Sequence, residues 1–438
     1  MRQYESALNQ GFIQLKPIEL LTKTDGEIRL DPSVEFQSVV GFGGAFTEAA
    51  ALTFSRMSPQ SQEKILTLYF DPTEGLRYRL GRIAIHSCDF ALGNYTYVDD
   101  YDTTLSSFSI DREKQWVIPM IQRAEQKAGQ AIALLASPWS PPAWMKTNGE
   151  MNHGGKLKLE YYSVWAQYFL KFIEAMTREG LTIDAVSAQN EPAAVQIWDS
   201  CIFTPEEEGR FVLEHLGPTL KESQHAAVKL YIWDHNRDII VDRVKPILEN
   251  PKASQYIHGV GFHWYVSEAY ENLSEVKRLF PDTHLLFTEG CIEGGPHLGA
   301  FHTGERYVRN MIGDFSHGCE GYIDWNLCLD MEGGPNHVGN YCDAPLLCDP
   351  ASDTVHINSS YYGLGHFARF IDVGAVRIHS EATQHAPSHV AFKNPDGSIV
   401  VVLQNETDTV KTTTLKRDQN EHTLTLQPHS YSTVILGV

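Results

Sequence analysis

The sequence predicts an α/β protein: a (β/α)₈ TIM barrel with a smaller antiparallel β-domain at its side. From Val39 to Ile371, eight short apolar runs alternate with amphipathic helical stretches, which is the pattern of a barrel of parallel strands. Outside those bounds both ends of the chain read as strands. Polar residues with chemical functions follow nearly every apolar run, which favours a closed barrel over the alternative, a doubly wound open sheet.

The expected elements of the barrel follow one another in a regular order. The strands are Val39–Gly44, Tyr78–Ile85, Ala131–Ala136, Ala185–Ala188, Lys229–Trp233, Gly259–His263, His284–Thr288 and Gly321–Trp325. The helices are Ser58–Tyr69, Arg112–Lys127, Glu160–Arg178, Thr204–Leu216, Ile239–Leu248, Ser267–Leu279, Gly304–Phe315 and Ser359–Ile371. One helix start is well marked, because Thr204 suits the N-cap and Pro205 the first turn.

The two ends of the chain depart from this pattern. Phe12–Leu21 and Glu27–Ser38 alternate like strands before the barrel. Six candidate strands follow it: Ala375–His379, Val390–Lys393, Ser398–Gln404, Val410–Leu415, His422–Leu426 and Tyr431–Leu436. We therefore assign residues 39–371 to the (β/α)₈ barrel and expect residues 1–38 and 372–438 to form a side domain resembling a β-sandwich.

The composition is that of a soluble globular protein, with 42% hydrophobic and 21% charged residues among 438. Thirty-five basic against fifty-five acidic side chains give a net charge of −20, which argues against nucleic acid or an anionic membrane as the main partner. A neutral sugar substrate is compatible with this charge, although solubility alone explains it equally well. No run reaches membrane-spanning length, so we expect no integral membrane segment.

The amino-terminal residues lack the apolar stretch of a secretory signal, which predicts a cytoplasmic protein, with non-classical secretion as the alternative. The seven cysteines show no CxxC spacing and read as reduced thiols. Oligomeric state stays open, with a homo-oligomer among the alternatives.

Two glutamates stand at the ends of predicted strands. Glu191 lies in Ala-Gln-Asn-Glu-Pro, and Glu289 ends Leu-Leu-Phe-Thr-Glu, three strands later. A carboxylate at the carboxyl end of a barrel strand is well placed for catalysis, and two of them suggest the acid/base and nucleophile of a glycoside hydrolase. We assign Glu191 as the acid/base and Glu289 as the nucleophile, which needs the lower pKa of the two. The alternative interpretation is a purely structural role, in which each glutamate is a rim residue or a helix-capping anion.

Other strand ends carry groups suited to support such a pair. Arg82, His263 and Tyr265 could hold the nucleophile ionised, although Arg82 and His263 also suit purely structural roles. Tryptophan side chains suit stacking against sugar C–H faces as well as core packing, and five stand near strand ends: Trp139, Trp144, Trp233, Trp264 and Trp325. Polar groups suited to bind sugar hydroxyls are Asp89, Asn190, Asp234 and Asn340.

Motifs of other chemistries are absent from the sequence, including HExxH, GxGxxG, the Walker phosphate loop and GxSxG. The histidines His86, His235 and His263 offer only weak support for metal binding. We expect neither a metal nor a cofactor.

Several blocks of sequence resemble glycoside hydrolase family 30, and within it the glucosylceramidase (acid β-glucosidase) branch. They are Gly41–Glu48, Ser87–Phe90, Ala136–Asn148, Gln189–Pro192, His263–Tyr265, Thr288–Cys291, Asp324–Leu327 and Glu332–Asn336. The resemblance extends over essentially the whole chain. The chain lacks the export signal and the amino-terminal disulfide cysteines of the lysosomal relatives. We therefore expect neither lysosomal residence nor an activator-protein partner.

The resemblance implies retaining hydrolysis of β-glycosides, with Glu191 as acid/base and Glu289 as nucleophile. It also implies a glucose site formed by Asp89, Trp139, Asn190, Trp325 and Asn340, supported by Arg82, His263 and Tyr265. We expect an exo-β-glucosidase or glucosylceramidase acting on a β-glucoside or glycolipid, within sphingolipid or carbohydrate metabolism. The alternatives are an endo-β-1,6-glucanase, β-xylosidase or β-fucosidase of the same family, and a catalytically silent glycan-binding protein.

Overall fold

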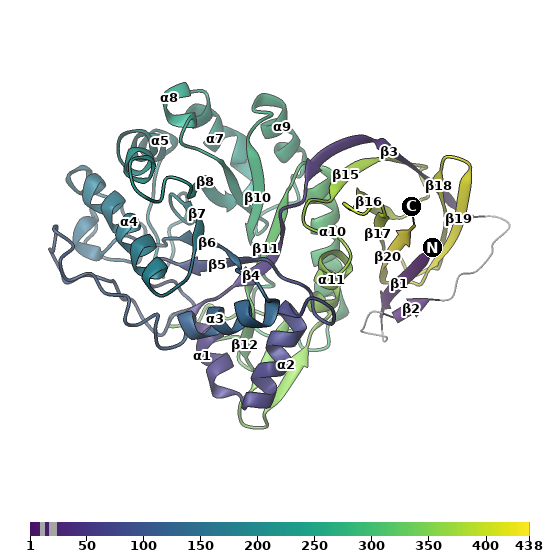
Figure 1. Ribbon diagram of the computed structural model, residues 1–438, viewed down its shortest axis with the longest axis horizontal. Coiled ribbons are helices and arrows are strands. Elements are labelled where there is room, and N and C mark those ends of the chain that lie inside the picture. Colours follow the sequence, from purple (N-terminus) through teal and green to yellow (C-terminus); the bar gives the residue numbers. More distant parts are fainter. Residues whose placement is uncertain (9–13, 17–23, 438) are drawn as a thin grey trace.

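The eight predicted strands close into a parallel barrel. The computed structural model describes residues 1–8, 14–16 and 24–437. The barrel order is β10-β11-β4-β5-β6-β7-β8-β9, which confirms the closed barrel over the open sheet (Figure 1). The strands are β4 (Gly41–Ala45), β5 (Leu80–Ala84), β6 (Ala133–Ser137), β7 (Ile183–Ser187), β8 (Lys229–Asn236), β9 (Gly259–His263), β10 (His284–Glu289) and β11 (Gly321–Asn326).

Helices connect these strands on the outside of the barrel. The longer ones are α2 (Pro59–Phe70), α3 (Val117–Ala128), α4 (Tyr162–Arg178), α5 (Pro205–Phe211), α7 (Ile240–Leu248), α9 (Glu271–Leu279), α10 (Phe301–Ser316) and α11 (Ser359–Ala368). The short ones are α6 (Gly217–Lys221), α8 (Pro251–Ser254), the 3₁₀ turns η1 (Ala143–Met145), η2 (Leu159–Tyr161) and η4 (Arg237–Ile239), and the π-helical η3 (Val212–Leu216). The predicted cap of α5 is confirmed, because the Thr204 hydroxyl accepts from the Glu207 N–H and the Glu207 side chain accepts from the Thr204 N–H.

Two parts of the barrel domain were not predicted. Helix α1 (Glu48–Arg56) follows β4 directly, and its residues 48–54 are all buried, so it has no polar face that would reveal a helical period. Between β11 and α11 lies a small sheet of β12 (Cys328–Asp330), β13 (Leu346–Asp349) and β14 (Thr354–Ile357). Two predicted helices begin later than expected, at Val117 and Glu271, because irregular turns precede them.

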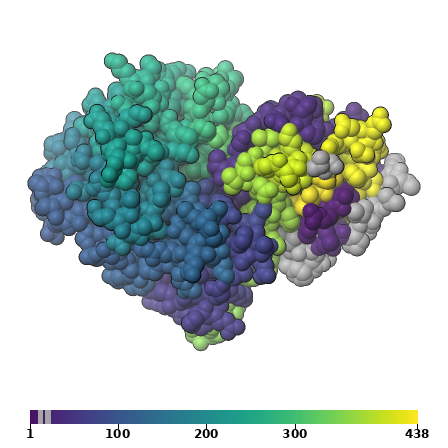
Figure 2. All heavy atoms as spheres, viewed as in Figure 1, coloured from purple at the N-terminus to yellow at the C-terminus, as the bar shows by residue number. Residues whose placement is uncertain are grey.

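The amino- and carboxyl-terminal segments form one nine-stranded sheet, in the order β19-β18-β3-β15-β16-β17-β20-β1-β2 (Figure 1). In Figure 2 the purple amino-terminal and the yellow carboxyl-terminal atoms lie side by side. Its strands are β1 (Arg2–Ala7), β2 (Gln14–Lys16), β3 (Gly26–Ser38), β15 (Val376–Ala382), β16 (Ser388–Lys393), β17 (Ile399–Asn405), β18 (Lys411–Arg417), β19 (Asn420–Leu426) and β20 (Ser430–Leu436). Of the predicted strand Phe12–Leu21 only β2 lies within the described residues. The sheet folds over one apolar core that includes Ile28, Leu415 and Val434.

Helices α10 and α11 join this sheet to the barrel (Figure 1). The Tyr431 hydroxyl of β20 donates to the Ser359 carbonyl at 3.0 Å. His366 of α11, fully buried, contacts the hydroxyls of Thr433 and Ser6 at 2.8 and 3.1 Å. Among the described residues, no helix combines the length and apolar character needed to cross a bilayer.

Candidate active site

The carboxyl ends of the barrel strands open into a cavity of about 260 Å³. Its lining consists of Asp89, Trp139, Glu191, Gln196, Trp198, His235, Asn236, Tyr265, Val266, Glu289, Cys291, Glu293, Trp325, Asn340 and Cys342. Seven of the predicted site residues are therefore brought together here, although they come from segments after six different barrel strands. This is the end of the barrel at which TIM-barrel enzymes carry their catalytic groups.

Glu289 is the last residue of β10 and is 6% exposed. The Arg82 guanidinium forms an ion pair with its Oε2 atom, and the Tyr265 hydroxyl donates to its Oε1 atom at 2.9 Å. Both carboxylate oxygens are thus held by donors, which fixes the orientation of the side chain.

Glu191 follows β7 and adopts a left-handed backbone conformation, with φ of 46°. Its N–H donates to the Asp234 carbonyl at 3.0 Å, which ties this strained residue to β8. Its Oε1 atom lies 3.0 Å from His263 Nδ1 and 3.6 Å from His235 Nε2. Its Oε2 atom makes no hydrogen bond within the described part of the chain, so this oxygen stays available to a ligand.

Beneath the pocket lies a buried polar cluster centred on Asp234. Its Oδ2 atom accepts from Arg82 at 2.8 Å, and its Oδ1 atom faces His263 Nε2 at 3.1 Å and accepts from Thr288 at 2.6 Å. Asn190 Oδ1 also accepts from Arg82 at 2.8 Å. Asp234, predicted to bind a sugar hydroxyl, is fully buried and instead holds Arg82 and His263 in place. Asn190 holds Arg82 through its Oδ1 atom, and its contact with a sugar hydroxyl stays a prediction.

The charges of this cluster set its pKa values. Burial alone would lower the pKa of His263, but the charge of Glu289 and hydrogen bonds with Asp234 and Glu191 raise it to about 9. Burial likewise opposes ionisation of Asp234, yet Arg82 and His263 hold its pKa far below the usual range. Arg82 and His263 are therefore cations, and the Asp234 carboxylate and the neighbouring glutamates lie close enough to balance them.

The pKa shifts of the two glutamates are opposite to the sequence expectation. Burial and the charge of Glu191 raise the pKa of Glu289, against the opposing effects of His263 and Arg82. Burial would also raise the pKa of Glu191, but His235, His263 and Arg82 together lower it. The physical reason is that Glu191 faces two imidazoles that the sequence could not place around it. The opposite directions of the two shifts reflect the different surroundings of two neighbouring, coupled carboxyl groups.

Asp89 and the stacked tryptophans form the opposite wall. Asn340 and Asn336 donate to Asp89 Oδ2 at 3.0 and 3.2 Å. Burial and the charge of Glu289 raise the pKa of Asp89 to about 7, although the Asn340 hydrogen bond opposes this. Trp139 and Trp325 stack at 5.3 Å between ring centroids. This wall offers carboxylate and amide groups beside apolar ring surface, which suits a sugar.

Only two of the five tryptophans at predicted strand ends line the pocket. Trp233 and Trp264 are buried in the barrel core, and Trp144 packs edge-on against Tyr161. Pocket residues that the sequence did not indicate as part of a sugar site include Trp198, Cys291 and His235, the last considered only as a weak metal ligand. His235 was not placed in the pocket because β8 runs three residues beyond its predicted end at Trp233.

The ligand atoms of Glu191, His263 and Glu289 lie within 4.8 Å of one another, which is also the spacing of a metal site. Both ring nitrogens of His263 already contact carboxylates, and both Glu289 oxygens already accept hydrogen bonds. The arrangement therefore favours a pair of reacting carboxyl groups over a metal centre.

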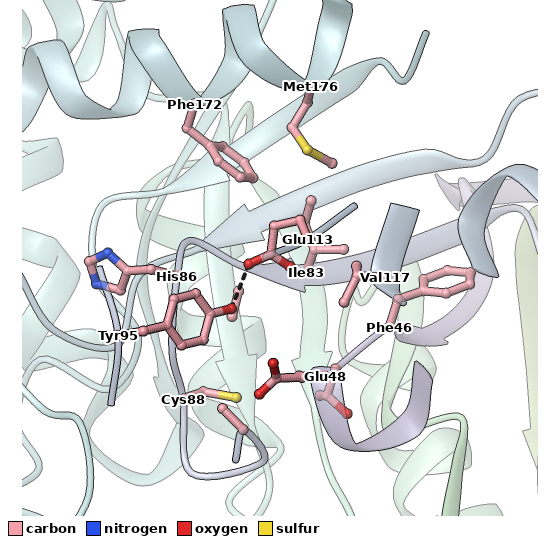
Figure 3. A pocket seen from close by; sticks show the side chains of 13 residues that line it. Phe46, Glu48, Ile83, His86, Cys88, Tyr95, Glu113, Val117, Phe172 and Met176 are labelled. Atoms are coloured by element: carbon pink, nitrogen blue, oxygen red, sulfur yellow. Dashed lines mark hydrogen bonds between the residues drawn. The ribbon is translucent and has the colours of Figure 1, made fainter. Parts of the chain in front are cut away.

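A second, enclosed cavity of about 10 Å³ lies behind β5 (Figure 3). Glu113 faces it and accepts from the Tyr95 and Tyr97 hydroxyls at 2.5 and 3.0 Å. Burial raises the pKa of Glu113 to about 7, although both tyrosines oppose this. The cavity has room for about one water molecule, so it cannot hold a sugar.

A (β/α)₈ barrel with two facing carboxyl groups at its carboxyl-terminal end has the architecture of a glycoside hydrolase. The chain belongs to glycosyl hydrolase family 30. Residues 39–371 match the TIM-barrel domain of that family, and residues 374–434 match its beta sandwich domain.

Similar proteins support this membership. The lysosomal acid glucosylceramidase of Mus musculus is 39% identical over 86% of this chain and 77% of its own length. The crystal structure of SrfJ from Salmonella typhimurium is 37% identical, with a TM-score of 0.95 over 99% of both chains. A solved endo-β1,6-glucanase is 28% identical, with a TM-score of 0.89 over 99% of this chain and 98% of its own. The protein is therefore a glycoside hydrolase.

Proposed function

We propose that the protein is a retaining exo-β-glucosidase that accepts glucosylceramide or related β-glucosides. The observation that carries the proposal is the approach of Glu191 and Glu289 within one pocket, with carboxylate oxygens within 4.8 Å of each other. Retaining enzymes hold their carboxyl groups about 5–5.5 Å apart, whereas inverting enzymes need about 6.5–9.5 Å to admit a water molecule.

In the first step, Glu191 gives its proton to the departing glycosidic oxygen, and the bond from that oxygen to the anomeric carbon breaks. Glu289 forms the new bond to this carbon, giving a glucosyl-enzyme and a free alcohol. Positive charge on the sugar develops beside Glu289 and favours its ionised form, so Glu289 reacts as the carboxylate and Glu191 as the acid. The unpartnered Oε2 atom of Glu191 is the oxygen left to deliver it.

In the second step, Glu191 takes a proton from water as the water oxygen attacks the anomeric carbon. The ester bond to Glu289 breaks, and β-glucose leaves with Glu191 protonated again. Arg82 and Tyr265 hold the Glu289 carboxyl group throughout both steps. They therefore stabilise the carboxylate that is released when the ester bond breaks in the second step.

Similarity favours a lipid glucoside as substrate, because the mouse glucosylceramidase is 39% identical to this chain. An endo-β-1,6-glucanase is the second candidate, supported by the 28% identical solved structure and by a 28% identical Neurospora crassa enzyme of that name. Hydrolysis rates should be compared on an aryl β-glucoside, glucosylceramide in detergent micelles and a β-1,6-glucan. We expect the first two to be cleaved with glucose as the only sugar product. Release of oligosaccharides from the glucan, with glucosylceramide intact, would establish the second candidate instead.

A further inference from the structure

His235 owes its place beside Glu191 to an irregularity in β8. The register between β8 and β9 shifts between Trp233 and His235, and Trp233 and Asp234 have φ values of 69° and 48°. In a regular strand, neighbouring side chains point to opposite faces. Here Asp234 enters the buried cluster while the next residue, His235, lines the pocket. The bulge thus gives the site two consecutive residues of one strand.

His235 and His263 approach the same oxygen of Glu191. His235 Nε2 lies 3.6 Å from Oε1, and His263 Nδ1 lies 3.0 Å from it. The His235 side chain is only 11% exposed and packs against the Trp233 ring at 4.9 Å between centroids. The imidazole is therefore held in a fixed orientation toward Glu191.

The other ring nitrogen of His235 indicates its protonation state. Nδ1 is buried and has no hydrogen-bond partner among the described residues. A buried N–H without an acceptor is costly, so the ring proton belongs on Nε2, the nitrogen that lies 3.6 Å from Glu191 Oε1. Burial and the charge of His263 lower the pKa of His235, although Glu191, Asp238 and Asp234 oppose this. His235 is thus a neutral donor, in contrast to the cationic His263.

We propose that His235 is a positioning residue for the acid/base glutamate. With His263 Nδ1 at 3.0 Å from Oε1 and the His235 Nε2–H next to it at 3.6 Å, that oxygen serves as an acceptor, and the transferable proton of Glu191 is confined to Oε2. The proton then faces the leaving oxygen in the first step, and the same oxygen meets the water in the second. This inference rests on the proposed function, because it requires Glu191 to be the acid/base.

Three substitutions test the role of His235. H235Q keeps an N–H at about the reach of Nε2, H235M fills a similar volume without a donor, and H235N has an amide too short to reach Glu191. The measurement is kcat/KM for phenyl β-glucoside, whose leaving group needs a proton, and for 2,4-dinitrophenyl β-glucoside, whose leaving group does not. The pH dependence of kcat/KM is also measured on phenyl β-glucoside.

We expect H235M and H235N to lose about tenfold or more on phenyl β-glucoside and about twofold or less on the dinitrophenyl substrate. The alkaline limb of their pH profile should move to higher pH, because a donor to the Glu191 carboxylate is gone. H235Q should stay near wild type on both substrates. If H235M does not fold, H235N still tests the loss of the N–H group beside Glu191.

Equal losses on both substrates, with H235Q equally impaired, would overturn the proposal and leave His235 a packing residue. Wild-type values in H235M or H235N would overturn it as well. Failure of the wild-type protein to cleave either glucoside is a different result, because it contradicts the proposed function itself.

Discussion

Arg82 organises the site at the scale of single residues. It is fully buried and contacts Glu289, Asp234 and Asn190, which come from three other strands. Unpaired, such a cation would be very costly to bury, but Asp234 and the glutamate pair balance Arg82 and His263. Glu191 and Glu289, the proposed catalytic pair, thus belong to a buried cluster in which cations and carboxylates lie side by side.

The sequence located the two glutamates because a charged residue directly after an apolar run marks the end of a barrel strand. It could not place His235, since a bulge depends on pairing with the neighbouring strand and leaves no local pattern. The directions of the glutamate pKa shifts were wrong for the same reason. They depend on distances to imidazoles from β8 and β9 that the chain order does not give.

At the scale of elements, the bulge of β8 is held by helix α5. The Trp233 N–H donates to Glu208 Oε1 at 2.8 Å, and Glu208 is 1% exposed. The Trp233 indole N–H donates to the Asn236 carbonyl at 3.0 Å, which closes the bulge from the other side. A helix on the outside of the barrel therefore fixes the backbone that directs Asp234 and His235.

Glu208 can be tested by substitution. E208A leaves a buried N–H unpaired and should lower the free energy of unfolding by about 1–3 kcal/mol, measured by urea denaturation. It should also lower kcat, because Asp234 and His235 lose their orientation. E208Q keeps an acceptor and serves as the matched control, with stability and kcat near wild type. A variant E208A as stable and active as the wild type would show that α5 does not hold the bulge.

Helices with a polar face were predicted, whereas α1 was not, because burial on all sides removes the periodic pattern. The cap of α5 was predicted because it depends only on Thr204 and the next three residues. Local chemistry therefore reveals where an element starts, and tertiary burial hides an element that has no exposed side.

At the scale of the whole molecule, both chain ends complete one sheet beside the barrel. Strand β3 pairs antiparallel with β15 and parallel with β18, and β1 pairs antiparallel with β20. The strand-like character of both ends predicted that they share a β-domain. Their order in the sheet was not predictable, because alternation reveals the buried face of a strand and not its neighbours.

The buried titratable groups predict how stability depends on pH. Burial raises the pKa of Asp89 and Glu113 to about 7 and that of Asp324 to about 8. The stability from such a carboxyl is fully present below its unfolded pKa and is lost as pH rises through the folded pKa. His263, with a pKa of about 9, likewise loses its contribution as pH rises through that value.

We therefore expect the melting temperature to fall steadily between pH 6.5 and pH 9. Below pH 6.5 the buried His86, whose pKa burial lowers to about 4, acts in the opposite direction. E113Q removes one raised carboxyl outside the pocket while keeping an acceptor for both tyrosines, so it should reduce the fall up to about pH 7 and leave the fall from pH 7 to pH 9 as in the wild type. A melting temperature that is flat or rises over this range would contradict these electrostatics.

The central claim is the division of roles between the two carboxyl groups, and the configuration of a trapped product tests it most directly. E289A and E191A should each be given an activated aryl β-glucoside with sodium azide, and the glucosyl azide examined by NMR. Without the nucleophile, azide enters the opposite face, so E289A should yield the α-azide. E191A still forms the glucosyl-enzyme, and azide should displace Glu289 to yield the β-azide. The reverse pattern, to which the pKa shifts alone would point, would contradict the assignment.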